Sequence, residues 1–151
     1  MIKRFFSLLA VIVLMFSFPG CARKTRPLIQ IKHESVQSID YKRTDFMTDS
    51  PDKRDHYIKT VTQNEDIEII LDWIESLKLQ KHDAIEVPTE KVEYVITLNG
   101  VKNHTVVFFD NYVIYDATVF TYLDSVQSKQ VSEYYNMLNY AEQPTEFDLI
   151  V

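Results

Sequence analysis

Four histidines are the side chains of this 151-residue chain best suited to bind a metal ion or transfer a proton. They are His33, His56, His82 and His104, and no two of them have the spacing of zinc ligands. Histidines scattered in this way are typical of ordinary surface or sheet positions. We therefore expect no metal site and no cofactor.

Four aspartates lie close together in the first half of the chain and offer the oxygen ligands that Ca²⁺ prefers. Lys53 and Arg54 lie among them, and the stretch lacks the glycine of an EF-hand loop. This composition favours a solvated loop over residues 48–55 rather than a calcium site. The aspartates are Asp45, Asp49, Asp52 and Asp55.

The chain has only two glycines, Gly20 and Gly100. It therefore holds neither a glycine-rich phosphate loop nor a G-x-S-x-G nucleophile elbow. The paired carboxylates of a glycosidase are brought together by the fold and leave no spacing in the sequence. A hydrolase, or an inhibitor of one, is therefore kept as an alternative function.

Cys21 is the only cysteine, which excludes an internal disulfide and a cysteine zinc cluster. It follows a segment with the three-part form of an export signal, in which Lys3 and Arg4 precede an apolar run over residues 5–18. As a helix, that run would span about 21 Å at roughly 1.5 Å per residue, short of the ~30 Å hydrocarbon core of a bilayer. The pattern indicates an export signal rather than a membrane-spanning helix.

The residues Phe18-Pro19-Gly20-Cys21 resemble the lipobox of bacterial lipoproteins. Gly20 matches the small residue before the cysteine and Cys21 matches the acceptor, whereas Phe18 stands where leucine is usual. The resemblance implies that the Cys21 thiol receives a diacylglycerol and that cleavage falls between Gly20 and Cys21. Two acyl chains anchor a protein stably. The resemblance therefore implies a protein anchored on the extracytoplasmic face of a cell membrane.

One folded domain is expected after the signal. Residues 1–20 are expected to form the signal peptide, 21–27 a lipidated tether, 28–142 a single domain and 143–151 a C-terminal tail. The net charge of −6 disfavours nucleic acid as a partner.

Hydrophobic periodicity predicts an α+β fold, in which a small antiparallel sheet, a three-stranded meander plus flanking strands, packs with two helices. Asn64 is expected to cap the first helix and Trp73 to lie in the core. The acids Glu68, Asp72 and Glu75 of that helix are expected to face water. Strands are expected over residues 28–34, 41–46, 56–61, 92–98, 101–109, 112–116 and 119–123, and helices over 64–79 and 128–140.

Asn99-Gly100 is a strong signal for a two-residue hairpin turn within the meander. Such a turn places Leu98 opposite Val101 and sorts the side chains onto a core face and a second, mixed face. A mixed face is either covered, here by the N-terminal strands or a helix, or used for binding. The candidate binding face consists of Val95, His104, Val106, Phe108, Val113 and Tyr115.

The order of helix, meander, further strand and terminal helix is similar to that of small exported lipoproteins of Gram-positive bacteria, in particular the YhfM-like type. The resemblance is carried by residues Ile67–Ile74, Tyr94–Ile96, Val113–Tyr115 and Tyr134–Leu138. It implies no catalytic residues. The leading hypothesis is a non-enzymatic module that binds an envelope protein or a wall component. An accessory factor for another exported protein is a further alternative.

Overall fold

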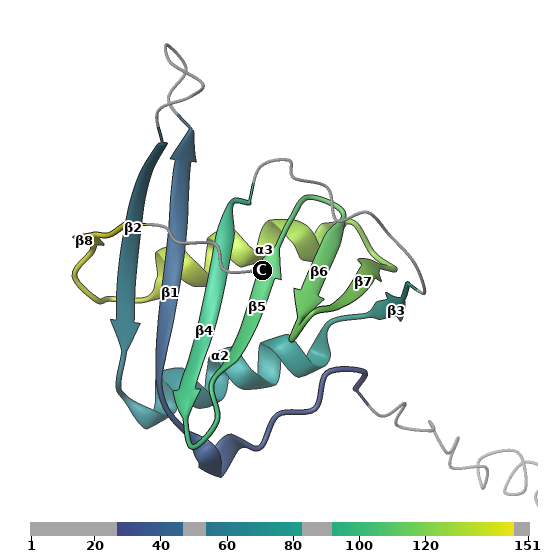
Figure 1. Cartoon of the computed structure of the whole chain (residues 1–151), viewed down its shortest axis with the longest axis horizontal. Helices are drawn as coiled ribbons and strands as arrows, with labels where there is room; N and C mark the ends of the chain where they lie inside the picture. The colour runs from purple at the N-terminus through teal and green to yellow at the C-terminus, as the bar shows by residue number, and fades with distance from the viewer. Residues whose placement is uncertain (1–26, 47–53, 83–91, 147–151) are drawn as a thin grey trace, which may run out of the picture.

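Eight strands form one antiparallel sheet, and two α-helices lie together against one of its faces (Figure 1). The computed structural model describes residues 27–46, 54–82 and 92–146. The predicted α+β class is confirmed. No helix in these three ranges is long and apolar enough to cross a membrane. The predicted signal peptide, with Gly20 and Cys21, lies outside the described residues.

The strand order in the sheet is β3-β7-β6-β5-β4-β1-β2-β8. Strands β4, β5 and β6 are the predicted meander, and two short edge strands, β3 and β8, were not predicted. The strands are β1 (Val36–Phe46), β2 (Arg54–Val61), β3 (Leu79–Lys81), β4 (Tyr94–Gly100), β5 (His104–Phe108), β6 (Tyr112–Tyr115), β7 (Thr118–Tyr122) and β8 (Gln143–Pro144).

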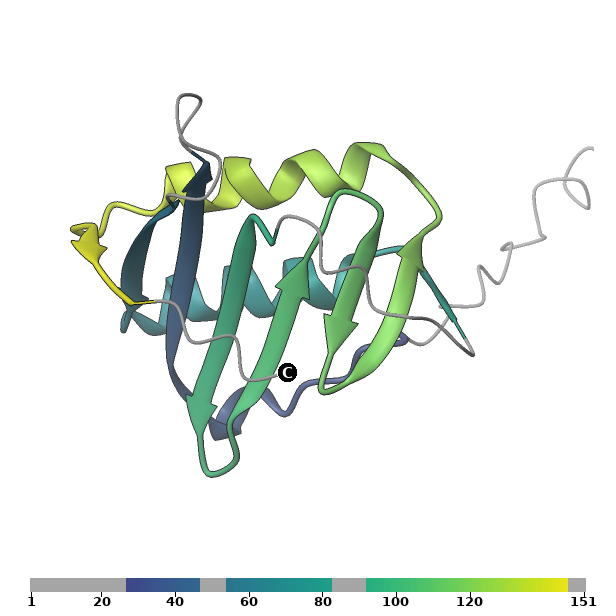
Figure 2. The same ribbon diagram turned by 45° about the horizontal axis from the view of Figure 1, so that its top comes forward.

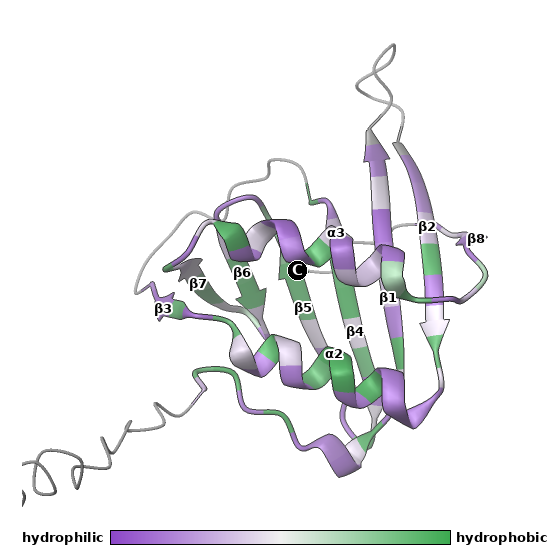
Figure 3. Cartoon of the chain, turned by 180° about the vertical axis from the view of Figure 1, so that it is seen from behind, coloured by the Kyte–Doolittle hydropathy of each residue, from purple (hydrophilic) through white to green (hydrophobic). Residues whose placement is uncertain are grey.

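Helices α2 (Asn64–Ser76) and α3 (Val126–Met137) each carry the chain across the sheet, α2 from β2 to β3 and α3 from β7 to β8. Figure 2 shows both crossing the strands on the same side, and Figure 3 shows hydrophobic and hydrophilic residues interspersed along each helix. Each helix buries one apolar stripe, which explains why both pack on a sheet face. Trp73 is 3% exposed, so its predicted place in the core is confirmed. The buried helix residues are Ile67, Ile70, Leu71, Trp73, Ile74, Val131 and Tyr135.

The first turn of α2 is not capped as predicted. Asn64 is already helical, and Gln63 occupies the cap position without a side-chain hydrogen bond. The Tyr140 hydroxyl accepts a hydrogen bond from the Gln63 backbone N–H at 3.2 Å and donates one to the Asp66 carboxylate at 2.8 Å. A tyrosine from the segment after α3 therefore satisfies an amide at this helix start, which no local pattern could indicate.

Residues 28–34 do not form the predicted strand. They run without regular structure into η1 (His33–Ser35), a short 3-10 helix before β1. The alternation in the sequence does reflect burial, since Ile29 is 1% exposed and Leu28 is 53% exposed. However, the Ile31 N–H donates to the Glu75 carboxylate of α2 at 2.7 Å rather than to a neighbouring strand. Alternation here marks packing against the domain and not sheet pairing.

The C-terminal tail was predicted to begin at residue 143, which is too early in the chain. Gln143 and Pro144 form β8 and lie opposite Ile58 and Tyr57 of β2. The sheet therefore extends beyond residue 142, and residues 147–151 lie outside the described ranges.

The hairpin between β4 and β5 is longer than the predicted two-residue turn. Leu98 lies opposite His104 rather than Val101, a shift of three positions. Gly100 belongs to β4 and lies opposite Val36 of β1, and a Cβ added to it would lie 1.9 Å from the Ser35 carbonyl oxygen. The glycine is therefore required for the close approach of two backbones and not for a tight turn.

A register shift by an odd number of residues exchanges the two faces of a strand, because side chains alternate. The predicted binding face is therefore wrong in all but one of its residues. Val95 alone lies on the face away from the helices. The other residues lie on the helix-covered side, and three of them are at most 2% exposed. They are His104, Val106, Phe108, Val113 and Tyr115.

The turn between β6 and β7 places two non-glycine residues in the left-handed region. Asp116 has a φ of 44° and Ala117 a φ of 65°. That region costs an L-residue roughly 1–2 kcal/mol. We expect Ala117→Gly to raise the free energy of unfolding by about 0.5–1 kcal/mol, measured by urea denaturation. Ala141 is an exposed control without positive φ, and an equal gain from Ala141→Gly would contradict this explanation.

Candidate functional site

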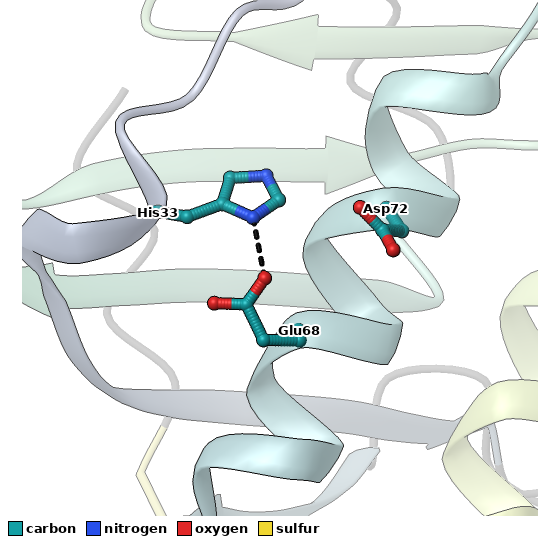
Figure 4. Close-up of side chains that lie close together, drawn as sticks. All are labelled: His33, Glu68 and Asp72. Carbon is teal, nitrogen blue, oxygen red and sulfur yellow. Dashed lines mark hydrogen bonds and ion pairs between the residues drawn. The ribbon is translucent and has the colours of Figure 1, made fainter.

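His33, Glu68 and Asp72 form a group in which side chains from two distant segments meet (Figure 4). His33 lies in η1, just before β1, whereas Glu68 and Asp72 lie one turn apart on α2 and therefore project from the same side. The His33 Nδ1 atom lies 2.7 Å from Glu68 Oε2. One nitrogen or oxygen atom from each residue falls within 4.8 Å of the other two.

A third carboxylate, that of Glu75, faces the other side of the imidazole. Its Oε2 atom lies 3.7 Å from His33 Nε2, and its Oε1 atom accepts the hydrogen bond from the Ile31 N–H at 2.7 Å. The segment before β1 is thus attached to α2 through both a backbone and a side-chain contact. Each ring nitrogen of His33 faces a carboxylate.

The group is open to water on the Glu68 side. The side chains of His33, Glu75 and Glu68 are 23%, 25% and 53% exposed, and Asp72 is exposed. Partial burial lowers the pKa of His33, but the hydrogen bond to Glu68 and the charges of three nearby carboxylates outweigh that effect. The pKa is therefore raised from its ordinary value of 6.5.

The raised pKa of His33 predicts a pH-dependent contribution to stability. The protonated ring stabilises the fold below the pKa of the unfolded chain, and this contribution is lost as the pH rises through the pKa of the folded chain. In the presence of a chelator, we expect His33→Gln to lower the free energy of unfolding by up to about 1 kcal/mol near pH 5 and to have little effect at about pH 9. Urea midpoints at the two pH values measure this, and an equal loss at both would contradict it.

The sequence interpretation of these residues is corrected in one respect. The acids of α2 were expected to form a solvated face, yet Glu75 is half-buried and bonded to the chain before β1. The spacing of Glu68, Asp72 and Glu75 on one side of a helix was visible in the sequence. The meeting with His33 was not, because only the fold brings η1 beside α2.

The other predicted chemical groups lie apart from this one. His104 Nδ1 is hydrogen-bonded to the Asp116 carboxylate, which also accepts from the Thr105 N–H at 3.1 Å and so holds the β6–β7 turn against β5. His56 Nδ1 lies 3.1 Å from the Thr44 hydroxyl.

Two of the four clustered aspartates lie in strands. Asp45 and Asp55 lie directly opposite each other in β1 and β2, and Asp45 is paired with Arg43 at 2.8 Å. Asp49 and Asp52 lie outside the described residues. Of the loop predicted over residues 48–55, the structure describes only Arg54 and Asp55, and both belong to β2.

Comparison with known proteins assigns no family. None of the protein-family models, the curated proteins or the solved structures matches the chain.

Proposed function

We propose that this protein is an exported lipoprotein, attached to the membrane through Cys21, whose folded domain is a non-enzymatic binding module of the cell envelope. The residue pattern ending in Phe18-Pro19-Gly20-Cys21 supports the anchor. Five residues separate Cys21 from Pro27, where the described domain begins. A chain of that length reaches about 20 Å, so the domain would be held close to the bilayer.

The observation that carries the binding part of the proposal is that α2 and α3 pack on the same sheet face (Figure 3). Within the described ranges no helix lies on the opposite face. Two neighbouring rows of side chains cross that face. The polar row consists of Thr60, Asp40, Thr97 and Thr105, and the mainly apolar row of Ile58, Lys42, Val95, Val107, Ile114 and Val119.

The polar row is the accessible part of this face. Thr60 and Thr105 are exposed, and the Thr60 hydroxyl donates to the Asp40 carboxylate at 2.8 Å. Val107 and Ile114 in the adjacent row are only 8% and 7% exposed, so they stabilise the sheet more than they offer contacts. A partner would therefore contact hydroxyl and carboxylate groups beside an apolar strip.

Photo-crosslinking in intact cells tests the proposed face. A photoreactive amino acid at Thr105 is expected to capture an envelope protein or wall component. The same probe at Glu133, an exposed residue of α3, is the matched control and should capture little. Adducts from Glu133 but not from Thr105 would contradict the proposed face.

The anchor gives a separate prediction. Wild-type protein is expected to incorporate radiolabelled palmitate and to sediment with membranes. Cys21→Ala should abolish the label, because Cys21 supplies the only thiol of the chain. Equal labelling of both proteins would exclude lipidation at Cys21.

A further inference from the structure

The donor atoms at His33, Glu68 and Asp72 combine one imidazole nitrogen with two carboxylate oxygens. Imidazole favours Zn²⁺ and its neighbours in the first transition row, and Zn²⁺ also accepts carboxylate oxygens. We propose that these three residues form a zinc-binding site with one coordination position left for water or a partner group. This inference is independent of the lipid anchor and of the proposed binding face.

The geometry needs little rearrangement to hold the ion. Zinc lies about 2.0–2.2 Å from nitrogen and oxygen ligands, so ligand atoms in a tetrahedral site lie roughly 3.3–3.5 Å apart. The three candidate atoms already lie within 4.8 Å of one another. Glu68 and Asp72 are exposed and lie one turn apart, so changes of side-chain rotamer can close the remaining gap without moving α2.

The second nitrogen of His33 has the surroundings expected for a metal-binding histidine. Such histidines usually direct the nitrogen that is not coordinated toward a carboxylate or a carbonyl group, which orients the ring. Here Nε2 faces the Glu75 carboxylate at 3.7 Å, and the Ile31 N–H holds that carboxylate in place. Nδ1 is thereby directed toward Glu68, whose side chain lies one turn from Asp72 on α2.

The charge balance also favours a cation. Glu68, Asp72 and Glu75 place three carboxylates along one side of α2, with only one imidazole facing them. Like charges four residues apart destabilise a helix. A divalent ion would neutralise charge that a protonated His33 leaves uncompensated.

The competing explanation is that His33 and Glu68 form a simple ion pair without a metal ion. Asp72 distinguishes this explanation from a zinc site. Asp72 makes no side-chain hydrogen bond among the described residues, so beside an ion pair between His33 and Glu68 it acts only through its charge. Asp72→Asn keeps the size of the side chain and should leave the His33–Glu68 contact intact. It should weaken zinc binding only if Asp72 is a ligand.

The test uses full-length protein without a histidine tag, stripped of metal with a chelator. Co²⁺ absorption followed by Zn²⁺ displacement should give one site per chain, with at least tenfold weaker binding in His33→Ala and in Asp72→Asn. Circular dichroism confirms that both variants fold. Zn²⁺ should also raise the urea midpoint of the wild type by mass action, and much less that of Asp72→Asn. His82→Ala is the matched control, because His82 is an exposed histidine outside the group.

Three outcomes would overturn the proposal. They are no uptake of Co²⁺ or Zn²⁺ by the wild type, unchanged affinity in Asp72→Asn or in His33→Ala, and an equal loss of affinity in His82→Ala.

Discussion

Replacement of Trp73 by alanine is expected to lower the free energy of unfolding by about 3–5 kcal/mol. The indole is 3% exposed and lies between two rings. It stacks on Phe108 of β5 with centroids 5.4 Å apart and on Tyr134 of α3 with centroids 4.5 Å apart. Because this one side chain joins α2, the sheet and α3, its loss opens a cavity that no single neighbour can fill.

Trp73→Phe should lower the free energy of unfolding by less than half as much as Trp73→Ala. It keeps a ring in the stack and removes the indole N–H, which is buried and has no hydrogen-bond partner in the described part of the chain. Urea denaturation should be followed by circular dichroism, because Trp73 is the only tryptophan and its loss removes the fluorescence signal. Ile69→Ala is the control, since Ile69 is 45% exposed on the same helix. A loss below about 1 kcal/mol for Trp73→Ala would show that the stack contributes little.

Replacement of Lys59 by methionine is expected to lower the free energy of unfolding by about 2–4 kcal/mol. Lys59 in β2 is 7% exposed. Its ammonium group donates to the carbonyl oxygens of Tyr135 and Leu138, at 3.0 and 2.9 Å, and lies 4.5 Å from the centre of the Tyr135 ring. The last carbonyl groups of a helix lack partners within the helix and carry the negative end of its dipole. The buried ammonium group of Lys59 supplies hydrogen bonds to these carbonyl groups and a positive charge at the negative end of the dipole.

Methionine is chosen because it keeps most of the volume of lysine and removes only the charge and the donors. The expected loss then reports the two hydrogen bonds rather than a cavity. Lys129→Met on the exposed side of α3 is the matched control and should change the free energy of unfolding by less than about 0.5 kcal/mol. If Lys59→Met unfolds at the same urea concentration as the wild type, the C-terminal turn of α3 does not depend on this lysine.

The elements with clear local periodicity were predictable, and those that depend on a distant neighbour were not. Helix α2 follows from the apolar spacing that includes Ile67, Ile70 and Ile74, and it begins at the predicted residue, Asn64. A tight turn also forms at Asp110-Asn111, two residue types that favour turns, since the Phe109 N–H donates to the Tyr112 carbonyl oxygen at 2.9 Å. Strands β3 and β8 consist of three and two residues, too few to show any period.

The hairpin at Asn99-Gly100 shows why a strong local signal can mislead. The pair favours a tight turn in isolation, but Gly100 instead lies against the Ser35 carbonyl and extends β4 along β1. The Asn99 side chain donates to Asp40 of β1 at 2.9 Å. Contacts with residues 59 to 65 positions earlier in the chain therefore set the register. The predicted binding face was lost with that register.

The sequence by itself determined the α+β class, the start and apolar side of α2, and the motif around Cys21 on which the proposed anchor depends. These depend on neighbouring residues in the chain, because hydrophobic periodicity and a short processing motif are local properties. Only the tertiary structure decided which face of the sheet the helices cover. Both faces of the meander carry apolar side chains, as Val95 and Ile96 illustrate. The pairing of β4 with β1 therefore decided which of the two faces lies under the helices. The tertiary structure also brought His33 to Glu68 and Asp72, because the separation of η1 and α2 along the chain leaves no spacing that a sequence pattern can reveal.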